Sequence, residues 1–131
     1  MPLPILLLLG LLGIYLMTRG QRHVDPDEAT LAELRRAGSD LARRHEMEFF
    51  LYLPDRPAAD LVAEQLTAEG FRVEVRAAAE SEDWLCLATR EMNPELDELH
   101  RLRRHLTAVA ESRNGVYDGW GATVVDAGDP A

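Results

Sequence analysis

The sequence has 131 residues, of which 47 % are hydrophobic, with 14 arginines, no lysine, 23 acidic residues and a single cysteine. This length supports one modest domain. A lone cysteine excludes an intramolecular disulfide, and no Cys/His pair lies at zinc-binding spacing. Arg19 and Arg22 are the only charged side chains before residue 25, so twelve arginines face 23 acids over residues 25–131, a net charge of −11. This balance disfavours direct binding of RNA or DNA and favours a basic protein partner.

The chain begins with an uncharged apolar stretch, residues 1–17, which as a helix would span about 25 Å. It lacks the basic first region and the cleavage site of a secretory signal, so we expect residues 1–18 to be an uncleaved transmembrane anchor. Arginines follow the stretch and none precedes it. This predicts a single-pass protein of the inner (cytoplasmic) membrane with its C-terminal domain in the cytoplasm. A cleaved signal and a start at Met17 are the alternatives.

Residues 19–44 are predicted to form a linker and an amphipathic helix. Residues 24–28 (VDPDE) are polar, and their acids suit the first turn of the helix that follows. Leu31, Leu34 and Leu41 then recur at helical spacing up to about Arg44.

Four strands and two further helices are predicted next. The strands are residues 46–53, 71–76, 84–89 and 116–125. In the first strand Met47, Phe49, Leu51 and Leu53 share one face, while Glu48, Phe50 and Tyr52 share the other. One helix follows the N-cap Asp55 and ends at Gly70. Another has Asn93 as its predicted N-cap, Pro94 as its first residue and Glu95 as a first-turn acid, and ends at residues 114–115 (NG).

The order strand, helix, strand, strand, helix, strand predicts an α+β fold, a ferredoxin-like βαββαβ sandwich over residues 45–125 with both helices on one face of an antiparallel sheet. Residues 126–131 are predicted to be a flexible tail. The other sheet face, with Phe50 and Tyr52, would be covered by the N-terminal helix or by a partner.

The most unusual segment is the string YDGWG in the last strand, which comprises Tyr117, Asp118, Gly119, Trp120 and Gly121. Glycines in a strand mark a bulge or a close backbone approach, and here they would let Trp120 turn outward as an anchor for a partner. Alternatively, Trp120 fills a gap at a bulged sheet edge and Asp118 caps its own turn.

No set of nucleophile, base and orienting group is evident, so no enzymatic activity, cofactor or metal is expected. Cys86 lies in the most apolar strand and is expected to be an inert buried thiol.

The YDGWG string, closing a small α/β domain, resembles the signature of the regulator of ribonuclease E activity B (RraB) family. The resemblance spans roughly residues 45–125, with support from the element order, the junction at residues 70–71 and the acidic balance. It implies a ferredoxin-like cytoplasmic protein that binds the non-catalytic part of ribonuclease E and inhibits RNA processing. The enterobacterial type of this family is soluble and ends in a long acidic tail, whereas this chain begins with an apparent anchor and stops soon after Asp126.

We therefore predict a membrane-tethered, non-enzymatic regulator of a ribonuclease E-type enzyme. The predicted partner-binding residues are Tyr117, Asp118, Gly119, Trp120 and Gly121, with Phe50 and Tyr52 on the open sheet face. Because those two rings resemble the stacking aromatics of RNA-recognition domains, an RNA-binding module is one alternative. A tethered interaction domain with a different, basic protein partner is another, and an enzyme using a cleft acid or histidine is the third.

Overall fold

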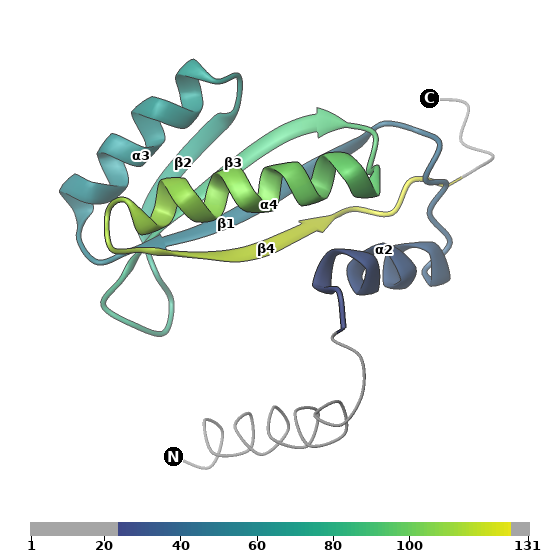
Figure 1. Cartoon of the computed structure of the whole chain (residues 1–131), viewed down its shortest axis with the longest axis horizontal. Coiled ribbons are helices and arrows are strands. Elements are labelled where there is room, and N and C mark those ends of the chain that lie inside the picture. Colours follow the sequence, from purple (N-terminus) through teal and green to yellow (C-terminus); the bar gives the residue numbers. More distant parts are fainter. Residues whose placement is uncertain (1–23, 127–131) are drawn as a thin grey trace, which may run out of the picture.

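The computed structural model describes residues 24–126. Its elements, in chain order, are α2 (Pro26–Arg36), β1 (His45–Leu53), α3 (Arg56–Ala68), β2 (Arg72–Ala77), β3 (Trp84–Met92), α4 (Leu96–Glu111) and β4 (Val116–Ala122) (Figure 1). The predicted anchor, residues 1–18, lies outside the described residues and stays a prediction, as does the tail beyond residue 126. Between residues 24 and 126, no helix combines the length and the apolar character that a membrane crossing needs.

The four strands form one sheet in the order β2-β3-β1-β4, and all neighbouring strands are antiparallel. Each of the two later helices joins strands that are not neighbours: α3 leads from β1 to β2 with β3 between them, and α4 leads from β3 to β4 with β1 between them. This is the split βαβ arrangement predicted for residues 45–125. The continuous apolar character of β3 is explained by its central position in the sheet.

The hydrophobic core lies between the sheet and the layer formed by α3 and α4, which cover the same face (Figure 1). The inward side chains of β1 alternate as predicted and are fully buried; they are Met47, Phe49, Leu51 and Leu53. They pack with the apolar stripes of the two helices, namely Val62, Leu66, Leu99, Leu102 and Leu106. Complete burial of one such side chain stabilises the fold by about 1.5–3 kcal/mol.

The helix boundaries were predicted with mixed success. Asp55 caps α3 by accepting a hydrogen bond from the Ala58 backbone N–H at 2.9 Å, and Gly70 ends that helix with φ of +103°, both as expected. The predicted cap of α4 is wrong, because the N-cap is Glu95. Asn93 instead donates from Nδ2 to the carbonyl of Ala42 at 2.8 Å, which ties the segment before β1 to the end of β3.

Helix α2 is shorter than predicted, and its position decides between the two that the sequence left open. It ends at Arg36 rather than near Arg44, because Gly38 adopts φ of +102° and the Ser39 N–H donates back to the carbonyl of Leu34 at 3.1 Å. The helix lies beside β4 and α4 rather than on the open sheet face (Figure 1). Phe50 and Tyr52 are therefore not covered by it.

The last strand is also shorter than predicted and ends at Ala122 instead of Val125. The chain after β4 pairs with the turn that follows α2. The Val125 N–H donates to Ser39 Oγ at 2.8 Å, and the Asp40 N–H donates to the Val125 carbonyl at 2.7 Å. Ser39 Oγ also lies 2.5 Å from Nε2 of the buried His45, so this contact joins three segments of the chain.

Candidate functional site

A β-bulge in β4 determines where the YDGWG side chains point. Phe49 of β1 pairs with Trp120 while Leu51 pairs with Tyr117, so two steps along β1 correspond to three along β4. Gly119 accommodates the extra residue with φ of +95°, a conformation that glycine adopts without strain. The predicted bulge is therefore confirmed.

The bulge turns both aromatic rings of the string toward the core. Tyr117 and Trp120 are each only 8 % exposed. The expectation that the glycines let Trp120 turn outward as a surface anchor is wrong, because the extra residue restores its inward orientation three positions after Tyr117. The alternative, in which Trp120 fills the edge of the sheet, fits the structure, although Asp118 caps no turn: its carboxylate has no hydrogen-bond partner within residues 24–126.

The two buried aromatic residues belong to a cluster that joins helix α2 to the rest of the domain. We call this cluster the Asp27 lock; it consists of Asp27 of α2, Arg103 of α4, and Tyr117 and Trp120 of β4. Nε and Nη2 of Arg103 each donate to a carboxylate oxygen of Asp27 at 2.9 Å, and Nε1 of Trp120 donates to Oδ1 at 3.1 Å. The Arg103 guanidinium lies over the Tyr117 ring, 5.3 Å from its centroid. Its hydrogen bonds to Asp27 raise the pKa of Arg103, and burial raises the pKa of Tyr117. The lock holds α2 against both α4 and β4.

A second contact extends the lock at the start of α2. Asp25 caps the helix through the N–H groups of Asp27 and Glu28, and its Oδ2 lies 2.6 Å from Nε2 of His100. Burial acts to raise the pKa of Asp25, but the hydrogen bonds from His100 and from the two N–H groups outweigh it and lower that pKa.

Asp25, Asp27 and His100 place three possible metal ligands within 4.8 Å of one another. The Asp27 carboxylate already accepts hydrogen bonds from a guanidinium and an indole, and Asp25 is engaged by His100 and by the helix N-terminus. A guanidinium beside the cluster opposes a second cation there. The geometry therefore indicates an ion-paired clamp.

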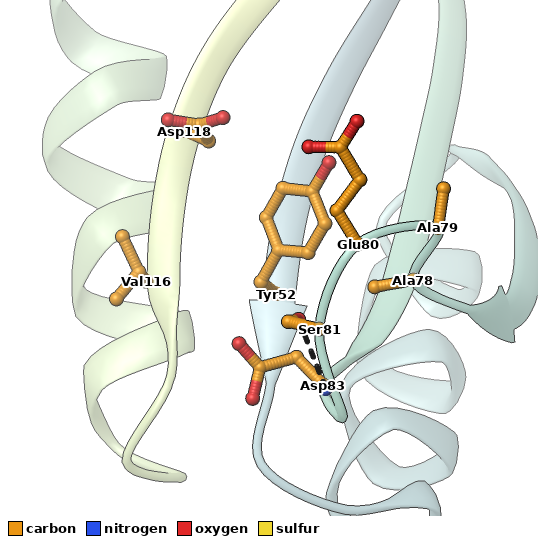
Figure 2. A pocket seen from close by; sticks show the side chains of 8 residues that line it. All are labelled: Tyr52, Ala78, Ala79, Glu80, Ser81, Asp83, Val116 and Asp118. Carbon is orange, nitrogen blue, oxygen red and sulfur yellow. Dashed lines mark hydrogen bonds between the residues drawn. The ribbon is translucent and has the colours of Figure 1, made fainter. Parts of the chain in front are cut away.

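The face of the sheet that points away from α3 and α4, which we call the open face, carries a different set of side chains. Phe50 and Tyr52 are half-buried on this face and Val116 is 59 % exposed, with Tyr52 and Val116 paired across the two strands. A hollow of about 560 Å³ opens here, which we call the Tyr52 hollow; it is lined by Tyr52, Ala78, Ala79, Glu80, Ser81, Asp83, Val116 and Asp118. Figure 2 shows the Tyr52 ring between the β2–β3 loop on one side and Val116 and Asp118 on the other. The hollow thus unites two of the predicted site residues.

The remaining predicted residues divide between the two faces. Gly121 lies on the open face opposite Glu48, and a Cβ at this position would lie 4.0 Å from the Phe50 ring. Phe50, Tyr52, Asp118 and Gly121 therefore belong to one open surface, while Tyr117 and Trp120 belong to the Asp27 lock.

Some carboxylates of the open face are paired with arginines and others are not. Its two arginines already have partners, since Arg72 pairs with Glu46 and Arg76 pairs with Glu74. Among the described residues, five carboxylates on this face or in the loop beside the hollow take part in no ion pair; they are Glu48, Glu80, Glu82, Asp83 and Asp118. The surface around the two rings is therefore both partly apolar and negatively charged.

Cys86 shows no sign of an activated nucleophile. Its thiol is fully buried and donates to the carbonyl of Ala59, with Sγ and O 3.1 Å apart. Burial raises the pKa of the Cys86 thiol to about 11, and the nearby charge of Asp60 acts in the same direction. This environment is that of a structural thiol.

The sequence-based prediction missed the central pair of the lock, Asp27 and Arg103. Asp27 reads as an ordinary first-turn acid, and Arg103 is one of several arginines on its helix. A partial signal existed, since Arg103 lies one position from the apolar stripe residue Leu102. Nothing local, however, links these two positions, which are 76 residues apart.

The comparison with known proteins agrees with the boundaries of the fold. The family model of RraB, "Regulator of ribonuclease activity B", matches residues 25–122. The match begins at the N-cap of α2 and ends at the last residue of β4, so it includes α2, which the resemblance based on residues 45–125 left out. A search of curated proteins returned no match. Because the matched segment covers well over half of the chain, the protein belongs to the RraB family of regulators of ribonuclease activity.

Proposed function

We propose that this chain is a non-enzymatic regulator that inhibits a ribonuclease E-type endoribonuclease by binding to its non-catalytic region. The observation that carries the proposal is the family match over residues 25–122. The described surface is consistent with it, since the open sheet face offers apolar groups and unpaired carboxylates for a protein contact. The regulator would act by occupying the enzyme's scaffold and not by altering the RNA.

The experiment is an RNA-cleavage assay with ribonuclease E from the same source and the full chain of 131 residues. We expect inhibition of the intact enzyme, saturable binding to its non-catalytic region, and no inhibition of an enzyme that lacks this region. Equal inhibition of the truncated enzyme would contradict the proposal, as would failure to bind the intact one. Incubation of the regulator with RNA alone serves as the control and should leave the RNA uncleaved.

We further propose that residues 1–18 anchor the protein in the inner membrane with the C-terminal domain in the cytoplasm. The uncharged stretch of residues 1–17 and the arginines that follow it support this orientation. A reporter that is active only in the periplasm should be inactive when fused to the C-terminus, and a cytoplasmic reporter should be active. The reverse pattern would contradict the orientation, and recovery of both fusions in the soluble fraction would contradict the anchor.

A further inference from the structure

We infer that the Tyr52 hollow and the sheet face around it bind an arginine-bearing segment of the partner protein. The inference rests on the proposed function and specifies the surface and the chemistry by which the partner is held. Helices α3 and α4 cover one side of the sheet and α2 packs beside β4, so within residues 24–126 no helix covers this second side, which only the β2–β3 loop borders (Figure 1). The face presents the half-buried rings of Phe50 and Tyr52 together with the exposed Val116.

The charge pattern of this face calls for a cationic occupant. The guanidinium groups of Arg72 and Arg76 are already paired with Glu46 and Glu74, so they do not neutralise the carboxylates nearer the hollow. Glu80 and Asp118 lie on either side of the Tyr52 ring (Figure 2). A basic segment placed over the ring would compensate both charges at once, which favours rapid and selective association.

The same arrangement favours arginine over lysine. A guanidinium is planar, stacks on aromatic faces and forms paired hydrogen bonds with a carboxylate, whereas an ammonium group acts as a point charge. Tyr52 supplies the ring, Asp118 and Glu80 supply the carboxylates, and Val116 offers an apolar surface for the stem of the side chain. The hollow of about 560 Å³ lies within the size range of sites that bind small ligands.

Two other occupants fit the surface less well. RNA would bring its phosphates toward the unpaired carboxylates of this face, and their repulsion would oppose the favourable counterion release on which nucleic-acid binding depends. A second copy of this chain, with its formal net charge of −9, would place like charges against one another.

The test uses the full chain and a fluorescent synthetic peptide in which arginine alternates with alanine and leucine, with binding followed by fluorescence anisotropy at low salt. The test variant is Glu80→Gln/Asp118→Asn. The matched control, Glu64→Gln/Glu111→Gln, removes two exposed carboxylates of the helical layer that make no ion pair among the described residues. We expect the test variant to weaken peptide binding about tenfold or more and the control to change it less than about twofold. Thermal unfolding should be the same for both variants.

Several binding results would overturn the inference. These are equal affinities of the test variant and the wild type, equal losses in both variants, equal binding of a lysine peptide of the same pattern, and tighter binding of a labelled single-stranded RNA. Self-association of the wild type that disappears in the test variant would also overturn it by assigning the face to a second copy. The ribonuclease assay separates this inference from the proposed function. If the test variant inhibits the enzyme as well as the wild type does, the surface is wrong while the regulator function stands. If the wild type does not inhibit, the proposed function fails whatever the peptide shows.

Discussion

Asp27 shows how a single carboxylate can be buried in a small domain. It is 1 % exposed, yet it accepts hydrogen bonds from Arg103 and Trp120, and it lies in the first turn of α2, where the helix dipole favours a negative charge. Without these partners, burying the charge would cost several kcal/mol. The aromatic string of β4 therefore serves first to hold α2 within the molecule.

Removal of the Arg103 guanidinium should show how far the stability of the fold depends on these partners of Asp27. We expect Arg103→Met to lower the free energy of unfolding by about 2–3 kcal/mol, because the Asp27 carboxylate then stays buried with only the Trp120 indole as a side-chain donor. Urea denaturation followed by circular dichroism measures the change. The control is Arg104→Met, at an exposed neighbour without an ion pair among the described residues, and it should stay within about 0.5 kcal/mol of the wild type. Equal effects of the two substitutions would contradict the role of the lock.

The buried thiol gives a second prediction at the same scale. Since the pKa of Cys86 is raised to about 11, the thiolate fraction at pH 8 is on the order of one in a thousand, and the thiolate becomes a major species only near that pKa. We expect the folded protein to resist Ellman's reagent at pH 8 and the urea-unfolded chain to react within minutes. Rapid reaction of the folded protein would show that the strand opens or that the thiol is activated.

At the scale of the element, the bulge in β4 separates two kinds of residue within five consecutive positions. Tyr117 and Trp120 face the helices, whereas Asp118 faces the other side of the sheet, where it borders the Tyr52 hollow. A regular strand would place Tyr117 and Trp120 on opposite faces, because side chains alternate with a period of two. The left-handed conformation of Gly119 is what permits both arrangements together.

Substitution of the two glycines should therefore have unequal effects. Gly119→Ala has open space for its Cβ, but it places a side chain on a residue with φ of +95°, so we expect a loss of about 1–2 kcal/mol in the free energy of unfolding. Gly121→Ala would bring its Cβ into ordinary contact with Phe50 at 4.0 Å and should change stability by less than about 0.5 kcal/mol. Chemical denaturation of both variants tests this, and similar losses would count against a strained bulge.

At the scale of the whole molecule, the negative charge should govern how fast a basic partner arrives. The chain has a formal net charge of −9. We expect the association rate with ribonuclease E to fall about tenfold or more between about 50 mM and 500 mM salt, while the dissociation rate changes less. Stopped-flow mixing at several salt concentrations measures both rates. An association rate that does not depend on salt would contradict electrostatic steering.

The sequence predicted the fold well wherever apolar and polar residues alternate with the period of a strand or a helix. The alternation in residues 46–53 correctly placed Phe50 and Tyr52 on the face away from the core, and the order of the elements predicted the sheet topology. At Gly119 the sequence predicted a bulge but left the direction of Trp120 open, and the prediction failed where a helix ended early, at Gly38. It also missed the Asp27 lock, because an ion pair between residues 76 positions apart leaves no local pattern.

The lock also has a mechanical consequence. Tension applied to the chain at Val24 passes into α2, and the contacts that hold α2 to the rest of the domain include the hydrogen bonds around Asp25 and Asp27. These side-chain bonds end on α4 and on the edge strand β4, so while they hold, α4 and β4 share the load before it passes along the chain from α2 into β1. A tether at the N-terminus would consequently pull on the edge of the sheet, and the central strands beneath Phe50 and Tyr52 would keep their register until α2 detached.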